Sequence, residues 1–312
     1  MALSPPSLFL LSCLLSVLLT PFSMSLAVTV HAIDTPDGGR KIHLSPTPRL
    51  GGVAVFLSVA LTALFLLPSS PTRDAWLTGG ALLSALGISD DIFSLSPRLK
   101  LFAMSAILLL PVCFGLAPNS MSVGDTVFPI SPVLGGCLAF LWTLALANAF
   151  NLIDGLDGLA ATQGIVVSLF LSLSGDPLAA LFGGTLFGFL PYNRTGLSLL
   201  VSPPKKIPTR SFLGDTGALF TGYSLALLSL GDGNSFSVFL PLLFALPLCE
   251  TLSSFFRRLR KGKNPFSADR DHLHHRLLKA GYSPTTAVFL LFLYALLFGS
   301  LFFLTEAVFP LF

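Results

Sequence analysis

The sequence predicts an all-α fold, a single integral membrane domain over residues 1–312 built from about ten transmembrane helices, with both termini extracytoplasmic. Three observations predict this class. Hydrophobic residues make up 53% of the chain and charged residues 11%, whereas charged residues make up about 25% of a soluble domain. Apolar segments of membrane-spanning length recur along the whole chain. The remaining basic residues collect in alternate loops between these segments.

The apolar segments divide the chain into ten expected spans, and this count is good to about one. The third and seventh segments are short for a hydrocarbon core of roughly 30 Å. Only Ser174–Pro177 separates the sixth segment from the seventh. The expected spans are 7–30, 50–67, 76–89, 99–117, 132–150, 158–174, 178–192, 212–230, 236–256 and 285–305.

The first apolar segment has two interpretations, an uncleaved span or a secretory signal peptide. A signal peptide begins with a positively charged region. The first basic residue of this chain is Arg40, on the far side of the segment. We therefore expect an uncleaved first span.

The distribution of basic residues predicts the orientation. With ten spans, the loops after spans 1, 3, 5, 7 and 9 share one side of the membrane and contain every Lys and Arg except Arg73. By the positive-inside rule, these loops are cytoplasmic. The net charge of +3 is uninformative by itself, and no nucleic-acid partner is expected.

Five polar clusters lie in the predicted cytoplasmic loops, near residues 31–49, 88–100, 148–160, 193–215 and 257–284. The most informative is the third, where Asn148, Asn151, Asp154 and Asp157 follow an apolar span at intervals of three. On a helix this spacing forms one polar stripe. Charge at the end of a membrane span is costly unless something binds it, so the stripe indicates a functional site.

The second cluster contains the adjacent acids Asp90 and Asp91, followed by Lys100. Adjacent carboxylates repel each other unless a cation or a proton neutralises one of them. Capping of the next short helix would explain one acid but hardly both. We therefore favour a divalent metal or a proton-transfer role.

The other clusters leave more than one interpretation open. Arg49 precedes the pair Gly51–Gly52, a helix start that suits an anion, although a basic residue here also suits lipid headgroups. Asp215 lies between glycines that could serve only close helix packing. The segment from His272 to Arg276 contains three histidines, which suggest zinc, but the neighbouring arginines favour phosphate over zinc.

Together, the clusters indicate chemistry on phosphates at a membrane surface. Several carboxylates and an Asn suit Mg²⁺, with Mn²⁺ as an alternative, because these ions prefer oxygen ligands. Arg and His side chains suit a diphosphate. A site between hydrocarbon and cytosol suits one lipid-soluble substrate and one water-soluble substrate.

In this order, the motifs resemble those of the polyprenyl-phosphate N-acetylhexosamine-1-phosphate transferases. The superfamily also includes phospho-MurNAc-pentapeptide translocase and the dolichyl-phosphate GlcNAc-1-phosphate transferase. The resemblance runs from about Asp34 to Ser283, and its last segment looks like the GlcNAc-1-phosphate transferase branch. The motifs are Arg40-Lys-x-His43 with Pro48-x-Leu-Gly-Gly52, Asp90-Asp91, Asn148–Ala160, Gly214-Asp-x-Gly217 and His272-x-His-His-Arg276.

The resemblance implies a bundle of ten or eleven transmembrane helices in the inner membrane, with a cytoplasmic active site. Undecaprenyl phosphate, or another polyprenyl phosphate, would attack the sugar-bearing phosphorus of a UDP-N-acetylhexosamine. UMP would leave, and the polyprenyl-diphosphate sugar would begin a cell-envelope glycan. UDP-GlcNAc is the expected donor, UDP-MurNAc-pentapeptide is the alternative, and a homodimer is compatible with the resemblance.

The resemblance also implies roles for individual residues. Asp215 and Asn151 would hold Mg²⁺ on the diphosphate, and Asp90 would deprotonate the lipid phosphate with Asp91 as its partner. The substrates would be bound by Arg49, Lys100, Asp154, Asp157, His272, His274, His275 and Arg276. At the end of span 9 the chain has Glu250, where the family often has Asp, and Met104 lies near the place of a common Gln.

Two other classes of function fit the sequence less well. A cation-coupled transporter would require acids near the bilayer midplane and an internal inverted repeat. The acids instead cluster on one predicted face, and no convincing repeat is present. A non-catalytic scaffold derived from the enzyme is disfavoured because Asp90, Asp91, Asn151 and Asp215 are all intact.

Overall fold

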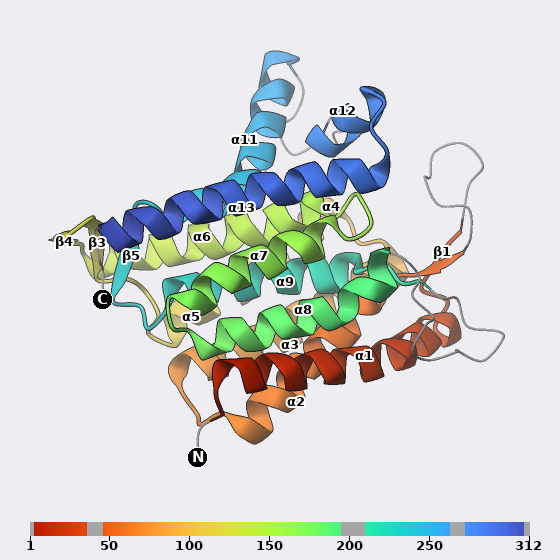
Figure 1. Ribbon diagram of the computed structural model, residues 1–312, viewed down its shortest axis with the longest axis horizontal. Helices are drawn as coiled ribbons and strands as arrows, with labels where there is room; N and C mark the ends of the chain where they lie inside the picture. Colours follow the sequence, from red (N-terminus) through yellow and green to blue (C-terminus); the bar gives the residue numbers. More distant parts are fainter. Residues whose placement is uncertain (1–2, 36–45, 195–209, 263–271, 309–312) are drawn as a thin grey trace.

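The computed structural model is a bundle of long helices that run roughly along one axis (Figure 1). It describes residues 3–35, 46–194, 210–262 and 272–308. Each expected span contains one helix or two consecutive helices, which supports the segmentation predicted from hydropathy. The helices are α1 (Pro5–Thr29), α2 (Gly51–Leu66), α3 (Pro71–Phe93), α4 (Pro97–Ile107), α5 (Leu110–Cys113), α6 (Pro132–Ile153), α7 (Leu159–Leu173), α8 (Pro177–Arg194), α9 (Gly214–Leu230), α10 (Leu240–Leu243), α11 (Ala245–Arg260), α12 (Leu273–Lys279) and α13 (Pro284–Val308).

Three of these helices are long and apolar enough to cross a membrane, judged by length and composition over the described residues. They are α1, α6 and α13. Helices α2 and α7 are also apolar but shorter. The fourth and ninth expected spans are each divided into a short and a longer helix, with Pro111 in α5 and Pro241 in α10 at these divisions.

The structure also contains short strands that the all-α prediction did not include. Strands β1 (Ile33–Asp34) and β2 (Thr47–Pro48) pair antiparallel at one end of the bundle. At the other end, β3 (Ser120–Val123) pairs antiparallel with β4 (Thr126–Pro129) and parallel with β5 (Ser235–Ser237). Strands of two to four residues are too short to show a periodic pattern in the sequence.

Helix α1 shows how the bundle is built for an apolar surrounding. Its outward positions carry exposed leucines, including Leu10, Leu14 and Leu18. Its buried face carries the small polar residues Ser12 and Ser16 and packs against α8. The Ser12 hydroxyl donates to the Leu181 carbonyl of α8 at 2.7 Å. Small residues inside and large apolar residues outside are typical of helix packing in membranes.

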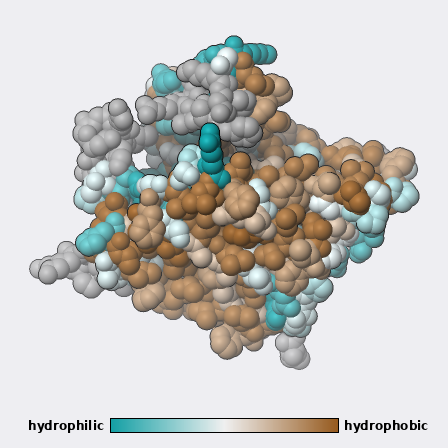
Figure 2. All heavy atoms as spheres, turned by 180° about the vertical axis from the view of Figure 1, so that it is seen from behind, coloured by the Kyte–Doolittle hydropathy of each residue, from teal (hydrophilic) through white to brown (hydrophobic). Residues whose placement is uncertain are grey.

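The outer surface is correspondingly apolar. Figure 2 shows hydrophobic residues over most of one face, with hydrophilic residues gathered toward its edges. Helix α13 contributes exposed leucines at one-turn intervals, Leu293, Leu297 and Leu301. Soluble monomers rarely expose contiguous apolar patches of this kind, so this surface fits a lipid environment.

Helix α9 lies at the centre and packs against α2, α3, α6, α7 and α8. Its contact with α3 is close, because a Cβ atom on Gly87 would lie only 2.3 Å from the Thr216 Cα atom. Two hydrogen bonds join the same helices deeper in the bundle, from Tyr223 to the Ala75 carbonyl and from Trp76 to the Ser224 hydroxyl. This packing sets the end of α3 against the start of α9, where the polar clusters meet.

Candidate active site

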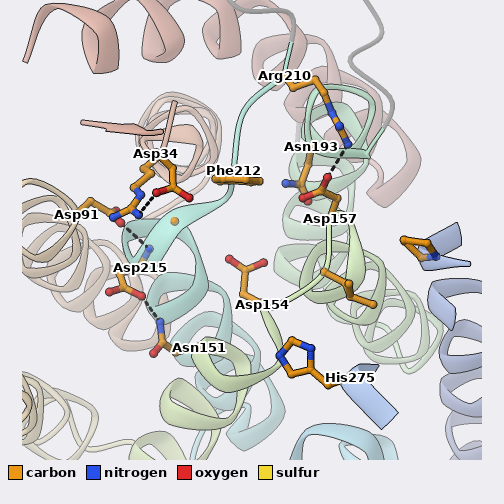
Figure 3. Close-up of a pocket in the computed structure, with 15 residues that line it drawn as sticks. Asp34, Asp91, Asn151, Asp154, Asp157, Asn193, Arg210, Phe212, Asp215 and His275 are labelled. Carbon is orange, nitrogen blue, oxygen red and sulfur yellow. Dashed lines mark hydrogen bonds and ion pairs between the residues drawn. The ribbon is translucent and has the colours of Figure 1, made fainter. Parts of the chain in front are cut away.

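A pocket of about 580 Å³ opens where α3, α6 and α8 end and α9 begins (Figure 3). All five polar clusters predicted from the sequence contribute to its wall. The lining residues are Asp34, Arg49, Asp91, Asn151, Asp154, Gly155, Leu156, Asp157, Asn193, Arg210, Phe212, Gly214, Asp215, His275 and Pro284. Segments that are far apart in the sequence therefore form one acidic site.

Asp91 caps the first turn of α9. Its Oδ1 accepts a hydrogen bond from the Asp215 N–H at 3.1 Å, and its Oδ2 accepts from the Thr216 N–H at 3.1 Å and the Thr216 hydroxyl at 2.8 Å. A carboxylate suits the positive end of a helix dipole. Gly214 makes the approach feasible with a φ of +71°. Asp91 thus fixes the backbone of Asp215.

Asp215 lies in a network that joins four helices. Its Oδ1 accepts a hydrogen bond from the Asn151 amide of α6, and its Oδ2 pairs with Lys100 Nζ of α4 at 2.8 Å. Lys100 Nζ also pairs with Asp90 Oδ2 of α3 at 2.7 Å. The ammonium group of Lys100 therefore lies between two carboxylates. It is a cation of the kind that the adjacent acids Asp90 and Asp91 led us to expect.

Asp90 has different partners from Asp91, although the two are adjacent in α3. Its Oδ1 accepts a hydrogen bond from the Leu95 N–H at 2.7 Å, which holds the turn between α3 and α4. The two acids thus have different partners, since Asp91 faces α9 and Asp90 faces Lys100. Capping explains Asp91, but the capped helix is α9 rather than the next helix along the chain.

Asp154 follows α6 directly and is half-buried in the pocket wall. Its carboxylate lies between Asn151 and His275 and points into the cavity (Figure 3). Over the described part of the chain, no side-chain hydrogen bond satisfies it. Burial raises the pKa of Asp154 well above its ordinary value, and the carboxylates of Asp215, Asp157 and Asp91 raise it further. A cation in the pocket would act in the opposite direction.

A second set of contacts holds the loop after α6. Arg210 pairs with Asp157 at 2.5 Å and also donates to the Arg194 carbonyl at 3.0 Å. The Asn193 side chain accepts from the Gly158 N–H at 2.8 Å and donates to the Ser211 carbonyl at 3.0 Å. On the neighbouring wall, Arg49 forms an ion pair with Asp34.

The histidine segment reaches the pocket through one residue, His275. His272 and His274 are buried, with 8% and 2% of their surface exposed. A Cβ atom on Gly155 would lie 2.4 Å from His274 Nε2, so the imidazole packs directly on the backbone at that glycine. Burial lowers the pKa of His274 to about 4, with His275 and His272 adding to the effect. The neutral ring is therefore the form that packs at Gly155.

The structure places some sequence-predicted residues outside the pocket wall. Arg276 is exposed on α12, and His272 and His274 lie beneath the surface. Lys100 pairs with Asp215, and Asp90 pairs with Lys100, but neither Asp90 nor Lys100 lines the pocket. Arg40, Lys41 and His43, named in the first motif, lie outside the described residues.

The polar and aromatic wall residues that received no role from the sequence are Asp34, Asn193, Arg210 and Phe212. Asp34 and Arg210 each form an ion pair with a predicted site residue, which no local spacing shows. Phe212 precedes the Gly214-Asp215 motif, and its N–H and carbonyl pair with Pro48 and Gly51. Its position beside the motif was the one available signal.

The donor groups in the pocket suit a hard divalent cation. In the part of the chain that the structure describes, no three His, Cys, Asp or Glu side chains are close enough to hold an ion by themselves. Mg²⁺ commonly binds through one or two carboxylates and completes its shell with water and substrate phosphates. Asp215, Asn151 and the unsatisfied carboxylate of Asp154 fit this pattern, and zinc sites do not resemble it.

A family model confirms the resemblance. The model for glycosyl transferase family 4 matches residues 75–231, from the start of α3 to the end of α9. The chain is also 32% identical to a probable undecaprenyl-phosphate N-acetylglucosaminyl 1-phosphate transferase of Bacillus subtilis, over 93% of this chain and 82% of that protein. The chain belongs to glycosyl transferase family 4.

Other relatives agree with this membership in glycosyl transferase family 4. A decaprenyl-phosphate N-acetylglucosaminephosphotransferase of Mycobacterium leprae is 29% identical over 82% of this chain and 72% of that protein. An undecaprenyl-phosphate alpha-N-acetylglucosaminyl 1-phosphate transferase of Escherichia coli is 28% identical over 91% and 79%. The apolar helices and the family together identify a multi-pass membrane protein.

Proposed function

We propose that this protein transfers GlcNAc-1-phosphate from UDP-GlcNAc to undecaprenyl phosphate and releases UMP. The observation that carries the proposal is the pairing of Asp215 with both Asn151 and Lys100 in an acidic pocket at one end of an apolar bundle. The names of the relatives support the sugar and the polyprenyl acceptor. The product would begin the assembly of a cell-envelope glycan.

The reaction exchanges one phosphoanhydride for another. An oxygen of the lipid phosphate attacks the sugar-bearing phosphorus, and a new P–O bond forms there. The bond from that phosphorus to the bridging oxygen breaks, and the electron pair leaves with UMP. The exchange is nearly thermoneutral, so catalysis depends on positioning and charge neutralisation more than on driving force.

Asp90 would accept the proton of the lipid phosphate. Burial and the neighbouring Asp215 raise the pKa of Asp90 above its ordinary value, while Lys100, at 2.7 Å, opposes the rise. A general base works best with a pKa nearer to the operating pH than that of a free carboxylate. The side chain of Asp90 is largely enclosed, 10% exposed, behind Asp215. Lys100 links Asp90 to Asp215, so a proton on Asp90 alters the charge balance of the whole network.

Mg²⁺, with Mn²⁺ as an alternative, would be held by Asp215 and the side-chain oxygen of Asn151, together with the donor phosphates. When bound, the ion supplies neutralisation of the diphosphate charge. Lys100 contributes a further positive charge behind Asp215. Asp91 keeps the Asp215 backbone fixed through its cap on α9.

The wall opposite Asn151 suits the nucleotide. Phe212 offers an aromatic face on which a uracil ring can stack. Asp157 and Arg210 lie beside it and offer hydrogen-bonding groups to a ribose or a phosphate. His275 approaches from α12 and can donate to the diphosphate or the sugar. Asp154 lies between these two sets of residues (Figure 3).

We place the pocket on the cytoplasmic side of the inner membrane, with ten crossing segments and extracytoplasmic termini. The position of the pocket supports this topology, because α3, α6 and α8 end at it, whereas α9 and α13 begin at it. Arg73, the single basic residue predicted outside, lies at the start of α3, and the acids Asp90 and Asp91 lie at its other end. The acids of the pocket therefore lie at one end of the bundle, and this argues against a transporter with its acids at the midplane.

The proposal is tested by incubating purified protein with undecaprenyl phosphate, Mg²⁺ and a panel of UDP-sugars, and by measuring UMP release. We expect release with UDP-GlcNAc and none with UDP-MurNAc-pentapeptide. Asp215→Ala and Asn151→Ala should abolish release without unfolding the protein. Absence of UMP with every donor would refute the enzymatic assignment, and wild-type rates from both variants would refute the site.

A further inference from the structure

Helix α11 carries a buried carboxylate that the proposed chemistry does not use. Glu250 is only 4% exposed, although the end of α11 stands clear of the bundle beside α12 (Figure 1). Burial of a carboxylate is costly unless its oxygens find partners. Both oxygens of Glu250 have one, and both partners lie at the start of α12.

The contacts of Glu250 join α11 to the first turn of α12. Its Oε2 accepts a hydrogen bond from the Leu273 N–H at 2.9 Å, and Leu273 is the first residue of α12. Its Oε1 lies 3.0 Å from Nδ1 of His272, the residue that precedes the helix. Ser254, one turn further along α11, lies 3.2 Å from the same nitrogen.

Arg257 completes this set of contacts on α11. One of its terminal nitrogens donates to the Ser254 hydroxyl at 2.8 Å and lies 3.9 Å from Glu250 Oε1. The guanidinium therefore supports the charge of the buried carboxylate. His272 is thereby used as an anchor for its own segment, because its Nδ1 faces Glu250 and Ser254.

The position of α12 depends on this anchor. A helix of seven residues is not stable in isolation. The free energy needed to nucleate a helix exceeds the stabilisation that the hydrogen bonds of one or two turns provide. The anchored end places His274 on Gly155 and His275 in the pocket wall. Glu250 therefore bonds directly to the segment that carries His275 into the pocket wall.

We propose that Glu250 is a positioning residue that holds α12 against α11, so that His275 meets the UDP-sugar, and thereby sets the affinity for the donor without touching it. The inference rests on the proposed function for its link to the donor. One carboxylate oxygen of Glu250 reaches the His272 ring and the other reaches the Leu273 N–H, so a single side chain holds the start of α12 at two points.

The first test compares three variants in steady-state kinetics. Glu250→Met keeps the side-chain volume and removes both acceptors, and Glu250→Gln keeps one acceptor for the Leu273 N–H. Leu252→Met is the matched control, because Leu252 is 55% exposed on the same helix. We expect KM for UDP-GlcNAc to rise about tenfold or more in Glu250→Met and less in Glu250→Gln. The KM for undecaprenyl phosphate, kcat and the control should stay unchanged.

The second test needs no substrate. Hydrogen–deuterium exchange of the peptide covering 273–279 should accelerate in Glu250→Met and stay at the wild-type rate in Leu252→Met. If Glu250→Met fails to fold, Glu250→Gln provides both measurements, with a smaller change in the same direction.

The two tests separate the possible failures. Unchanged exchange would overturn the anchor itself. Faster exchange with an unchanged donor KM, or a loss of kcat with both KM values unchanged, would overturn its link to the donor. A wild-type protein that releases no UMP would refute the proposed function, whereas the exchange rates would still decide whether Glu250 holds α12.

Discussion

The carboxylate of Asp91 holds the backbone of Asp215, with Asp91 Oδ1 3.1 Å from the Asp215 nitrogen. The contact joins the last turn of α3 to the first turn of α9, two helices that also touch at Gly87 and Thr216. The side chain of Asp215 is thereby presented to Asn151 and Lys100 from a fixed helix end. The adjacent acids have different structural roles, since Asp91 caps α9 and Asp90 pairs with the ammonium group of Lys100.

Thr216→Val should weaken this cap by removing one of the three hydrogen bonds to Asp91. We expect the free energy of unfolding to fall by about 1–2 kcal/mol, because a hydrogen bond to a charged group is lost from an enclosed site. Thr216→Ser keeps the hydroxyl and serves as the matched control. Thermal unfolding of the two purified variants measures the difference, and equal midpoints would contradict the cap.

Lys100→Met should slow turnover strongly while leaving the fold intact. The substitution leaves the carboxylates of Asp90 and Asp215 without the ammonium that pairs with both at 2.7 and 2.8 Å. We expect kcat to fall by a factor of about 100 or more, in the range for removal of one electrostatic group from an active site.

The control for Lys100→Met is Arg98→Met, because Arg98 is exposed and lies two residues earlier in the chain. The half-saturating Mg²⁺ concentration should fall in Lys100→Met, since Asp215 no longer shares its charge with lysine. A variant with wild-type kcat would show that Lys100 serves packing alone.

Much of the fold could be predicted because hydropathy and loop charge act locally along the chain. The expected spans coincide with helices, and five polar loops meet at one end. The pairing of β3 with β5 could not be predicted, since its partners are far apart in the sequence and each has only three or four residues. Backbone pairing of this kind depends on which helices lie side by side.

The site was predictable in its residue types and less so in its contacts. Asp154 and Asp215 were expected from their spacing and their glycines, and both line the pocket. The cap from Asp91 to α9 joins residues distant in sequence, so no motif reveals it. The motif predicts that His272 binds the donor, and its contact with Glu250 on α11 could not be predicted from the sequence. Burial of one histidine and exposure of the next depends on how α12 packs.

Asp154→Asn should stabilise the metal-free protein at neutral and higher pH. Burial and the neighbouring carboxylates raise the pKa of Asp154 in the folded protein, so the folded state binds more protons there than the unfolded state. Stability therefore falls as pH rises from about 4, the ordinary pKa of Asp, through the raised value. Asp154→Asn removes this loss and flattens the pH dependence.

The control for Asp154→Asn is Asp125→Asn, because Asp125 is exposed and lies beside β3. Unfolding in a chelator between pH 4 and 8 provides the measurement. An unfolding profile for Asp154→Asn that runs parallel to wild type would show that Asp154 is solvated like a surface acid. Adding Mg²⁺ should narrow the gap between the two proteins, because a cation in the pocket favours the ionised carboxylate of the wild type.

Gly155→Ala should displace the histidine segment, and its effect should depend on His274. The added Cβ atom would lie 2.4 Å from His274 Nε2, so the ring or the loop after α6 must move. Because His275 is adjacent and lines the pocket, we expect the donor KM to rise about tenfold, together with a loss of stability. The double variant Gly155→Ala/His274→Ala removes the ring that the new methyl group meets. Its donor KM should therefore be lower than additivity of the two single variants predicts, and a double-mutant cycle measures this coupling. Strict additivity would mean that Gly155 and His274 act independently, and that the loop tolerates a side chain at position 155 without moving α12.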